Sequence, residues 1–78
     1  MCTNFNTTDA AQIKALTAYA EALTIYHNIK GGSQAALTQY HVIEGMVTML
    51  RIFGVTAADM HTAREWAYEA FLTQNKKA

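Results

Sequence analysis

The sequence predicts an all-α fold, a three-helix bundle of up-down-up order with helices at about residues 8–30, 34–53 and 57–74. Apolar residues recur at spacings of three and four in all three segments, as in amphipathic helices. The 78-residue chain contains no proline and only four glycines, so little interrupts this periodicity. Short loops at 31–33 and 54–56 would turn each helix back along the previous one.

The first predicted helix begins at Thr8 or Asp9, because either side chain can accept a hydrogen bond from the free N–H groups of the first turn. Lys30 suits the negative end of the helix dipole, and Gly31 is predicted to end the helix in the left-handed conformation. The apolar surface is wider than one packing face needs. The helix has one narrow polar stripe, formed by Lys14, Thr17, Glu21, Thr24 and Asn28.

The second predicted helix begins after Ser33, a good N-cap, and ends at Gly54. Gly45 lies inside it at a cost of about 1 kcal/mol relative to alanine. We interpret this glycine as a point where another helix approaches closely. The seam residues are Ala36, Tyr40, Ile43, Val47 and Leu50. A second apolar row contains Val42, Met46, Met49 and Phe53, and the polar stripe contains His41, Glu44, Thr48 and Arg51.

The start of the third predicted helix has the clearest signals. Thr56 is the expected N-cap, and Asp59 stands three residues later, which is the spacing of a capping box. Val55 and Met60 are placed for a hydrophobic staple around this cap. The packing residues are Met60, Ala63, Ala67, Ala70 and Phe71, with Trp66 at their flank.

The composition indicates self-association. Apolar residues make up 51% of the chain and charged residues 15%, against about 25% charged in a typical soluble domain. The formal net charge is zero, so copies of the chain repel one another weakly. In a three-helix monomer each helix has two neighbours, and we expect some apolar surface to remain uncovered. We therefore predict a dimer or higher oligomer.

We expect residues 8–75 to form one domain, between an irregular tail at 1–7 and a frayed end at 76–78. The tail lacks the basic start and apolar run of a signal peptide, and no stretch approaches the ~18 apolar residues of a membrane span. Cys2 is the single cysteine, so no disulfide can form within the chain. These features favour a cytoplasmic protein that does not bind a membrane.

Two Tyr-His pairs flank the first turn, at Tyr26-His27 and Tyr40-His41. Folding the helices about this turn places the two histidines about one helical turn out of step and on different faces. We therefore expect a partly buried His27, an exposed His41 and no metal site within one chain, since zinc needs about four converging ligands. Pairing of a histidine with its own copy across a two-fold axis stays open.

Catalysis and nucleic-acid binding are not predicted. Cys2 has no nearby histidine and acid, and His61, Glu65 and Glu69 form ordinary pairs along one helix surface. Six Lys and Arg are scattered and balanced by six acids, whereas binding to phosphate backbones needs clustered cations. We expect no cofactor.

Residues 62–72, TAREWAYEAFL, resemble the closing helix of phage-encoded helical-hairpin proteins that sequester cyclic-oligonucleotide immune signals. Asn28-Ile29-Lys30 at the end of a helix is also similar to that family. The Gly-Tyr-Arg start of the family's first helix has no counterpart here. The resemblance implies sequestration of a nucleotide-like ligand.

The sequence favours a small non-catalytic helical interaction module, of the kind found among phage and mobile-element inhibitors or regulators that bind a host protein. The expected partner-binding anchors are Tyr40, Met46, Met49, Phe53, Trp66 and Tyr68, since aromatic residues and methionine are enriched in binding surfaces. The alternative is an oligomer that binds a small anionic or nucleotide-like ligand between subunits. Its expected ligand-binding residues are Tyr26, His27, Lys30 and Arg64.

Overall fold

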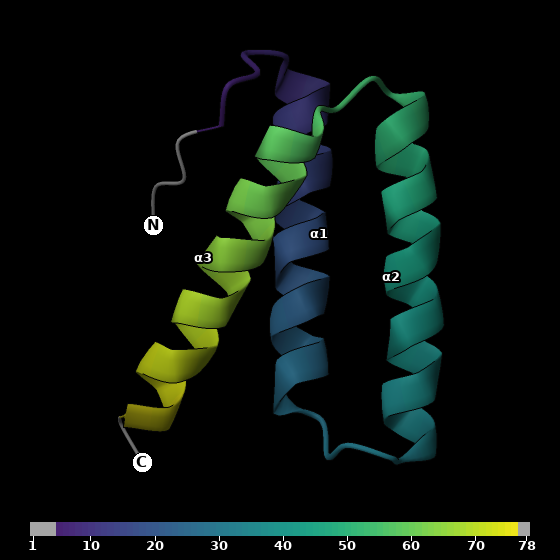
Figure 1. Cartoon of the computed structure of the whole chain (residues 1–78), viewed down its shortest axis with the longest axis vertical. Helices are drawn as coiled ribbons and strands as arrows, with labels where there is room; N and C mark the ends of the chain where they lie inside the picture. Colours follow the sequence, from purple (N-terminus) through teal and green to yellow (C-terminus); the bar gives the residue numbers. More distant parts are fainter. Residues whose placement is uncertain (1–4, 77–78) are drawn as a thin grey trace.

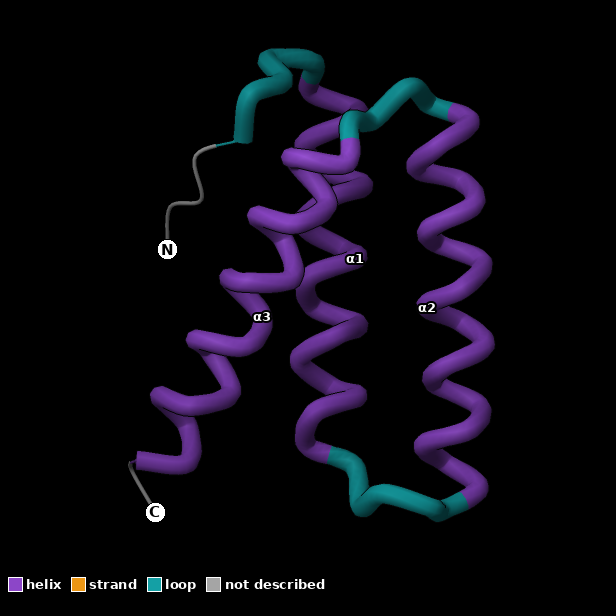
Figure 2. The backbone as a smooth tube through the Cα atoms, viewed as in Figure 1, coloured by secondary structure: helices purple, strands orange, loops and turns teal. Residues whose placement is uncertain are grey.

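The computed structural model describes residues 5–76 and consists of three α-helices joined by short loops (Figure 1). The helices are α1 (Ala10–Asn28), α2 (Gln34–Ile52) and α3 (Ala57–Lys76). Helix α2 runs antiparallel to α1, and α3 then returns in the direction of α1 (Figure 2). No strand is present in the described part of the chain. The predicted all-α fold with three helices in up-down-up order is confirmed.

Some predictions concern the chain ends. Those made for Met1–Asn4, including Cys2, and for Lys77 and Ala78 lie outside the described residues. The described residues that precede α1 are not helical, and Phe5 among them packs against the core.

Helix α1 is the central element, because both α2 and α3 pack closely on it, whereas no Cα atom of α2 lies within 8 Å of a Cα atom of α3 in the described chain. Figure 1 shows the reason: α3 crosses α1 at an angle, and its C-terminal end lies far from α2. The expectation that each helix has two neighbours is therefore wrong for α2 and α3. Both keep much of their surface uncovered.

The core follows the length of α1. Leu16 and Ala20 on α1 and Ala63 and Ala67 on α3 are fully buried, and such small side chains allow two helices to approach closely. Tyr19 fills the space beside them. The buried cluster consists of Leu16, Tyr19, Ala20, Ala22, Ile43, Leu50, Val55, Met60 and Ala63.

Two glutamines fix the register of α1 against α2. The side-chain Nε2 of Gln12 donates to the carbonyl oxygen of Phe53 at 2.8 Å. Near the other end, Nε2 of Gln39 donates to the carbonyl oxygen of Ala22 at 3.0 Å. Each bond joins the helices at one level, so sliding α2 along α1 would break both.

The predicted helix starts are confirmed. Asp9 caps α1 by accepting from the N–H of Gln12 at 3.0 Å, and Ser33 caps α2 by accepting from the N–H of Ala36 at 3.1 Å. Thr56 Oγ1 accepts from the N–H of Asp59 at 3.3 Å at the start of α3. These bonds satisfy N–H groups that have no partner inside a helix.

The predicted end of the first helix is wrong. Helix α1 ends at Asn28, because Ile29 adopts an extended conformation (φ −88°, ψ 140°). The left-handed residue of the turn is Gly32 (φ 83°) rather than Gly31. Gly54 has φ 82°, as predicted for the end of α2.

Asp59 holds the non-helical N-terminal segment against α3. Its carboxylate is 1% exposed and accepts from the backbone N–H of Asn6 at 2.6 Å and of Thr7 at 3.1 Å. The capping-box prediction is thus confirmed at Thr56, while the carboxylate of Asp59 binds a distant segment instead of the cap. Val55 and Met60, the predicted staple, are both buried in the core cluster.

We expect Asp59→Ala to lower the free energy of unfolding by about 2 kcal/mol, because it removes a buried charged acceptor from two N–H groups. Asp59→Asn keeps one acceptor oxygen and should lower the free energy of unfolding by a smaller amount. Urea unfolding followed by circular dichroism measures both. Glu69→Ala removes an exposed carboxylate from the same helix and serves as the control, with an expected change within about 0.5 kcal/mol. Equal losses for Asp59→Ala and the control would contradict this role for Asp59.

Candidate interaction surfaces

Helix α2 exposes a large amount of apolar surface because α1 is its single helical neighbour among the described residues. The side chain of Ile52 is 71% exposed and that of Met49 is 50% exposed. Other large apolar residues of α2 and its C-cap are exposed to a similar degree: Leu37, Tyr40, Val42 and Phe53. They lie on both flanks of the buried seam of α2.

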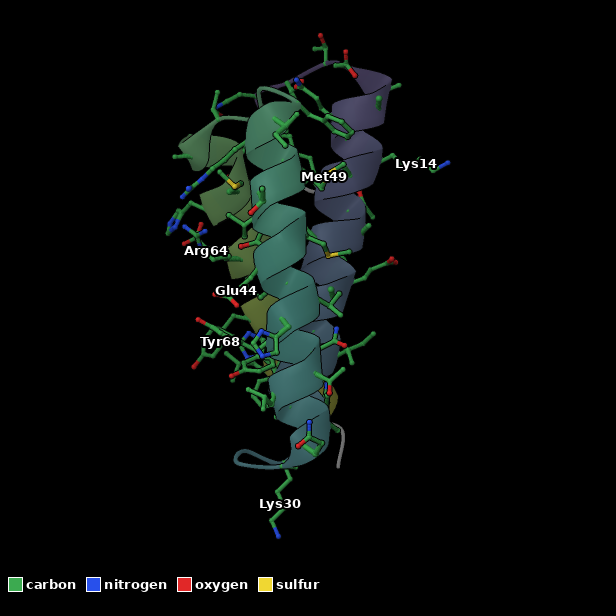
Figure 3. All side chains as sticks on the ribbon, turned by 90° about the vertical axis from the view of Figure 1, so that its right-hand side faces the viewer. Lys14, Lys30, Glu44, Met49, Arg64 and Tyr68 are labelled. Carbon is green, nitrogen blue, oxygen red and sulfur yellow. The ribbon has the colours of Figure 1, made fainter. Side chains whose placement is uncertain are left out.

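One flank forms an uncharged groove between α1 and α2. The groove has a volume of ≈ 410 Å³, and we call it the groove face. It is lined by Ala15, Ala18, Val42, Gly45, Met46, Met49 and Leu50. Every lining residue is apolar or glycine, and the small residues leave space that larger side chains could fill. Figure 3 shows Met49 beside α1, with Lys14 extending outward from α1.

Gly45 lies in the groove face with open space above it. A Cβ atom built at this position meets no atom within 4 Å. The predicted close approach of another helix to Gly45 is therefore absent within the described chain. The glycine costs about 1 kcal/mol of helix stability without an intramolecular reason.

The other flank of α2 belongs to a cluster of rings from all three helices, which we call the aromatic cluster. It consists of Tyr26, His27, Tyr40, Tyr68 and Phe71. The ring centroids of Tyr26 and Tyr40 lie 6.3 Å apart. The ring of His27 lies 6.0 Å from Tyr68 and 5.5 Å from Phe71. These separations are typical of favourable aromatic pairs.

The two Tyr-His pairs thus meet only through their tyrosines. His27 is half-buried and turns towards α3, whereas His41 is exposed and its Nδ1 lies 3.4 Å from Glu44 Oε1. This is the burial that the sequence predicted for each histidine. Contact between Tyr26 and Tyr40 was not predicted, although both lie near the same turn.

The four residues expected to bind a ligand do not converge within one chain. Tyr26 and His27 are neighbours in the aromatic cluster. Lys30 is exposed and points away from the helices in Figure 3. Arg64 lies nearer the start of α3 than the aromatic cluster does, and it donates from Nη1 to the hydroxyl of Tyr19 at 3.5 Å.

The six expected partner-binding anchors divide among three places. Met46 and Met49 line the groove face, and Phe53 follows on the same row of α2. Tyr40 and Tyr68 belong to the aromatic cluster, and both are about half exposed. Trp66 packs against the core, and its buried indole N–H has no acceptor in the described part of the chain. Ala15, Ala18 and Leu37 were not among the expected anchors, and their exposure depends on where the helices pack.

The described residues contain no group of three His, Cys, Asp or Glu side chains that could hold a metal ion. His61 and Glu65 lie 3.6 Å apart on an exposed helix surface. None of the described helices combines the length and the hydropathy needed to cross a bilayer.

We expect Gly45→Ala to raise the free energy of unfolding of the dilute protein by about 1 kcal/mol, because the added methyl group meets open space and favours the helix. Gly54→Ala is the contrasting variant and should destabilise by about 1–2 kcal/mol, since a Cβ is strained at positive φ. Urea unfolding at low protein concentration measures both. A destabilising Gly45→Ala would contradict the open environment of Gly45.

The groove face and the aromatic cluster both present exposed apolar side chains on helices. The groove face offers shape without charge, and the aromatic cluster offers tyrosine rings with hydroxyl groups. No protein-family model, curated protein or solved structure matches this chain.

Proposed function

We propose that the protein is a small non-catalytic helical interaction module that binds another protein and acts as an inhibitor or regulator of that partner. The observation that carries the proposal is the aromatic cluster, in which Tyr40 and Tyr68 are about half exposed. Tyrosine is enriched among the residues that dominate binding energy at protein interfaces. Leu37 lies one helical turn before the level of Tyr40 and adds exposed apolar surface.

The aromatic cluster is preorganised for binding. Tyr26 packs against Tyr40, and His27 packs against Tyr68, so each exposed tyrosine rests on a half-buried ring. A tyrosine side chain loses little conformational entropy when it is fixed, and rings that are already held lose less. The cluster can therefore contribute affinity without a costly rearrangement.

The charge pattern supports a partner recognised by apolar and hydrogen-bonding groups. The chain has six basic and six acidic residues, so it carries no net charge that would steer a strongly charged partner. Tyrosine hydroxyls can donate and accept hydrogen bonds at the edge of an apolar contact. A helical or extended segment with exposed apolar side chains fits this chemistry.

The double variant Tyr40→Ala, Tyr68→Ala tests the proposal. Hot-spot truncations cost about 2 kcal/mol or more, so the double variant should bind a captured host protein at least tenfold more weakly. The partner is first identified with the unaltered protein from a host extract, and affinity is then measured by calorimetry with purified components. Ile13→Ala removes an exposed apolar side chain near the other end of α1 and should bind normally. Undiminished binding by the double variant, with unchanged helicity, would reject the aromatic cluster as the binding surface.

A second candidate function is sequestration of a small anionic or nucleotide-like ligand. It is favoured by a groove of ≈ 430 Å³ at the start of α2, lined by residues that include Tyr26, Tyr40 and Ser33. Aromatic rings can stack on a base, and the start of a helix favours an anion. Of the four expected ligand-binding residues, Tyr26 alone lines this groove.

Native mass spectrometry of protein purified gently from its host distinguishes the two functions. Sequestration predicts an added mass of a small molecule, and it predicts that a nucleotide at 100 times its Kd stabilises the fold by about 2.7 kcal/mol. Protein binding predicts neither effect. The thermal shift is repeated with Tyr26→Ala, which should abolish it if the ligand occupies this groove.

A further inference from the structure

We infer that the groove face is a self-association surface, on which a second copy of this chain packs its α2 antiparallel about a two-fold axis between Gly45 and Met46. This inference adds to the proposed function and does not use the aromatic cluster. A second copy of the chain fits the groove face for three reasons. These are the apolar pattern of α2, the charges of α1 and the size of the face.

The apolar pattern of α2 is symmetric about the proposed axis. Val42 and Met49 lie on opposite sides of the midpoint between Gly45 and Met46, at the same distance from it along the helix. An antiparallel copy of α2 therefore places Val42 against the partner's Met49, and Met46 against the partner's Gly45. The last contact puts a large flexible side chain over a glycine whose Cβ position is open. The same surface thus carries both the protruding side chains and the space that receives them, as an isologous contact requires.

The charges of α1 are complementary under the same axis. Gln12 lies beside Phe53 and Gln39 lies beside Ala22, so the midpoint of α2 lies at the level of α1 residues 17 and 18. Lys14 and Glu21 are equally distant from that level. They lie on one row of α1 with Ala18, which lines the groove face. The axis therefore brings Lys14 of each copy to the level of Glu21 of the other copy. The dimer would contain two such pairs.

Both charged side chains are available for this contact. Lys14 and Glu21 are exposed, and neither forms an ion pair with another described residue. Lys14 extends outward from α1 beside the groove face in Figure 3. An unrelated partner would match this pair of opposite charges only by chance, whereas a second copy matches it by symmetry.

The face is large enough for a dimer. Helices α1 and α2 have 19 residues each. At about 28 Å long and about 10 Å wide, the two helices side by side present roughly 560 Å² in projection. Stable interfaces bury about 800 Å² of accessible surface per partner, which is of the same order because side chains roughen the projected area.

The first test compares two leucine substitutions on α2 by sedimentation and native mass spectrometry. Gly45→Leu places a side chain where the monomer has open space, so helicity should be kept while the partner's Met46 is excluded. The unaltered protein should be a dimer at micromolar concentration, and Gly45→Leu should be a monomer. Thr48→Leu adds a similar side chain on the exposed polar stripe of α2 and should remain a dimer. A monomeric unaltered protein, or a dimeric Gly45→Leu, would overturn the inference.

The second test uses the charges. Lys14→Glu and Glu21→Lys each replace two attractive contacts by two repulsive ones, so each variant alone should dimerise about tenfold more weakly. When one variant is labelled with ¹⁵N and mixed with the other, the heterodimer regains both attractive contacts. We expect heterodimers to exceed the statistical half of all dimers. A purely statistical mixture would contradict the proposed axis.

The two proposals fail separately. The double variant Tyr40→Ala, Tyr68→Ala should keep the dimer mass, because the aromatic cluster lies on the other flank of α2. If that variant binds the partner normally while Gly45→Leu is monomeric, the proposed binding surface is wrong and the self-association surface stands. If Gly45→Leu stays dimeric while the double tyrosine variant no longer binds the partner, the self-association surface is wrong and the proposed binding surface stands.

Discussion

The packing of Leu16 and Ala20 in the centre of α1 holds the molecule together, because α1 is the one helix that contacts both others. Helix α3 approaches it through the buried alanines Ala63 and Ala67, and α2 approaches it through Ile43 and Leu50. No Cα atom of α2 lies within 8 Å of a Cα atom of α3 in the described chain, so each of these helices is positioned mainly by its packing on α1. The placement of every surface feature therefore depends on α1.

The same geometry explains why so much apolar surface is exposed. A closed three-helix bundle would cover the flank of α2 that faces α3, but here α3 crosses α1 at an angle and leaves this flank open (Figure 1). The aromatic cluster forms on the flank that faces α3, where His27 reaches Tyr68 and Phe71. The groove face forms on the opposite flank, against the alanines of α1. One helix thus supplies two chemically different surfaces.

The sequence could predict what depends on neighbouring residues. Asp9, Ser33 and Thr56 are caps because a short side chain accepts from the N–H three residues later. The apolar rows follow from helical spacing alone. The separation of α2 from α3 could not be predicted, since the crossing angle depends on how side chains interlock. For the same reason the sequence places Tyr26 and Tyr40 on the correct helices but does not predict the contact between their rings.

The buried carboxylate of Asp59 has a consequence for the order in which the chain folds. Its bonds to Asn6 and Thr7 close loops of 53 and 52 residues, whereas each helix and its cap form from neighbours in the chain. Closing a long loop costs chain entropy that only an assembled α1 and α3 can repay. We therefore expect residues 5–9 to dock after α1 and α3 have assembled, and we expect their amides to exchange with solvent before those of the helix centres.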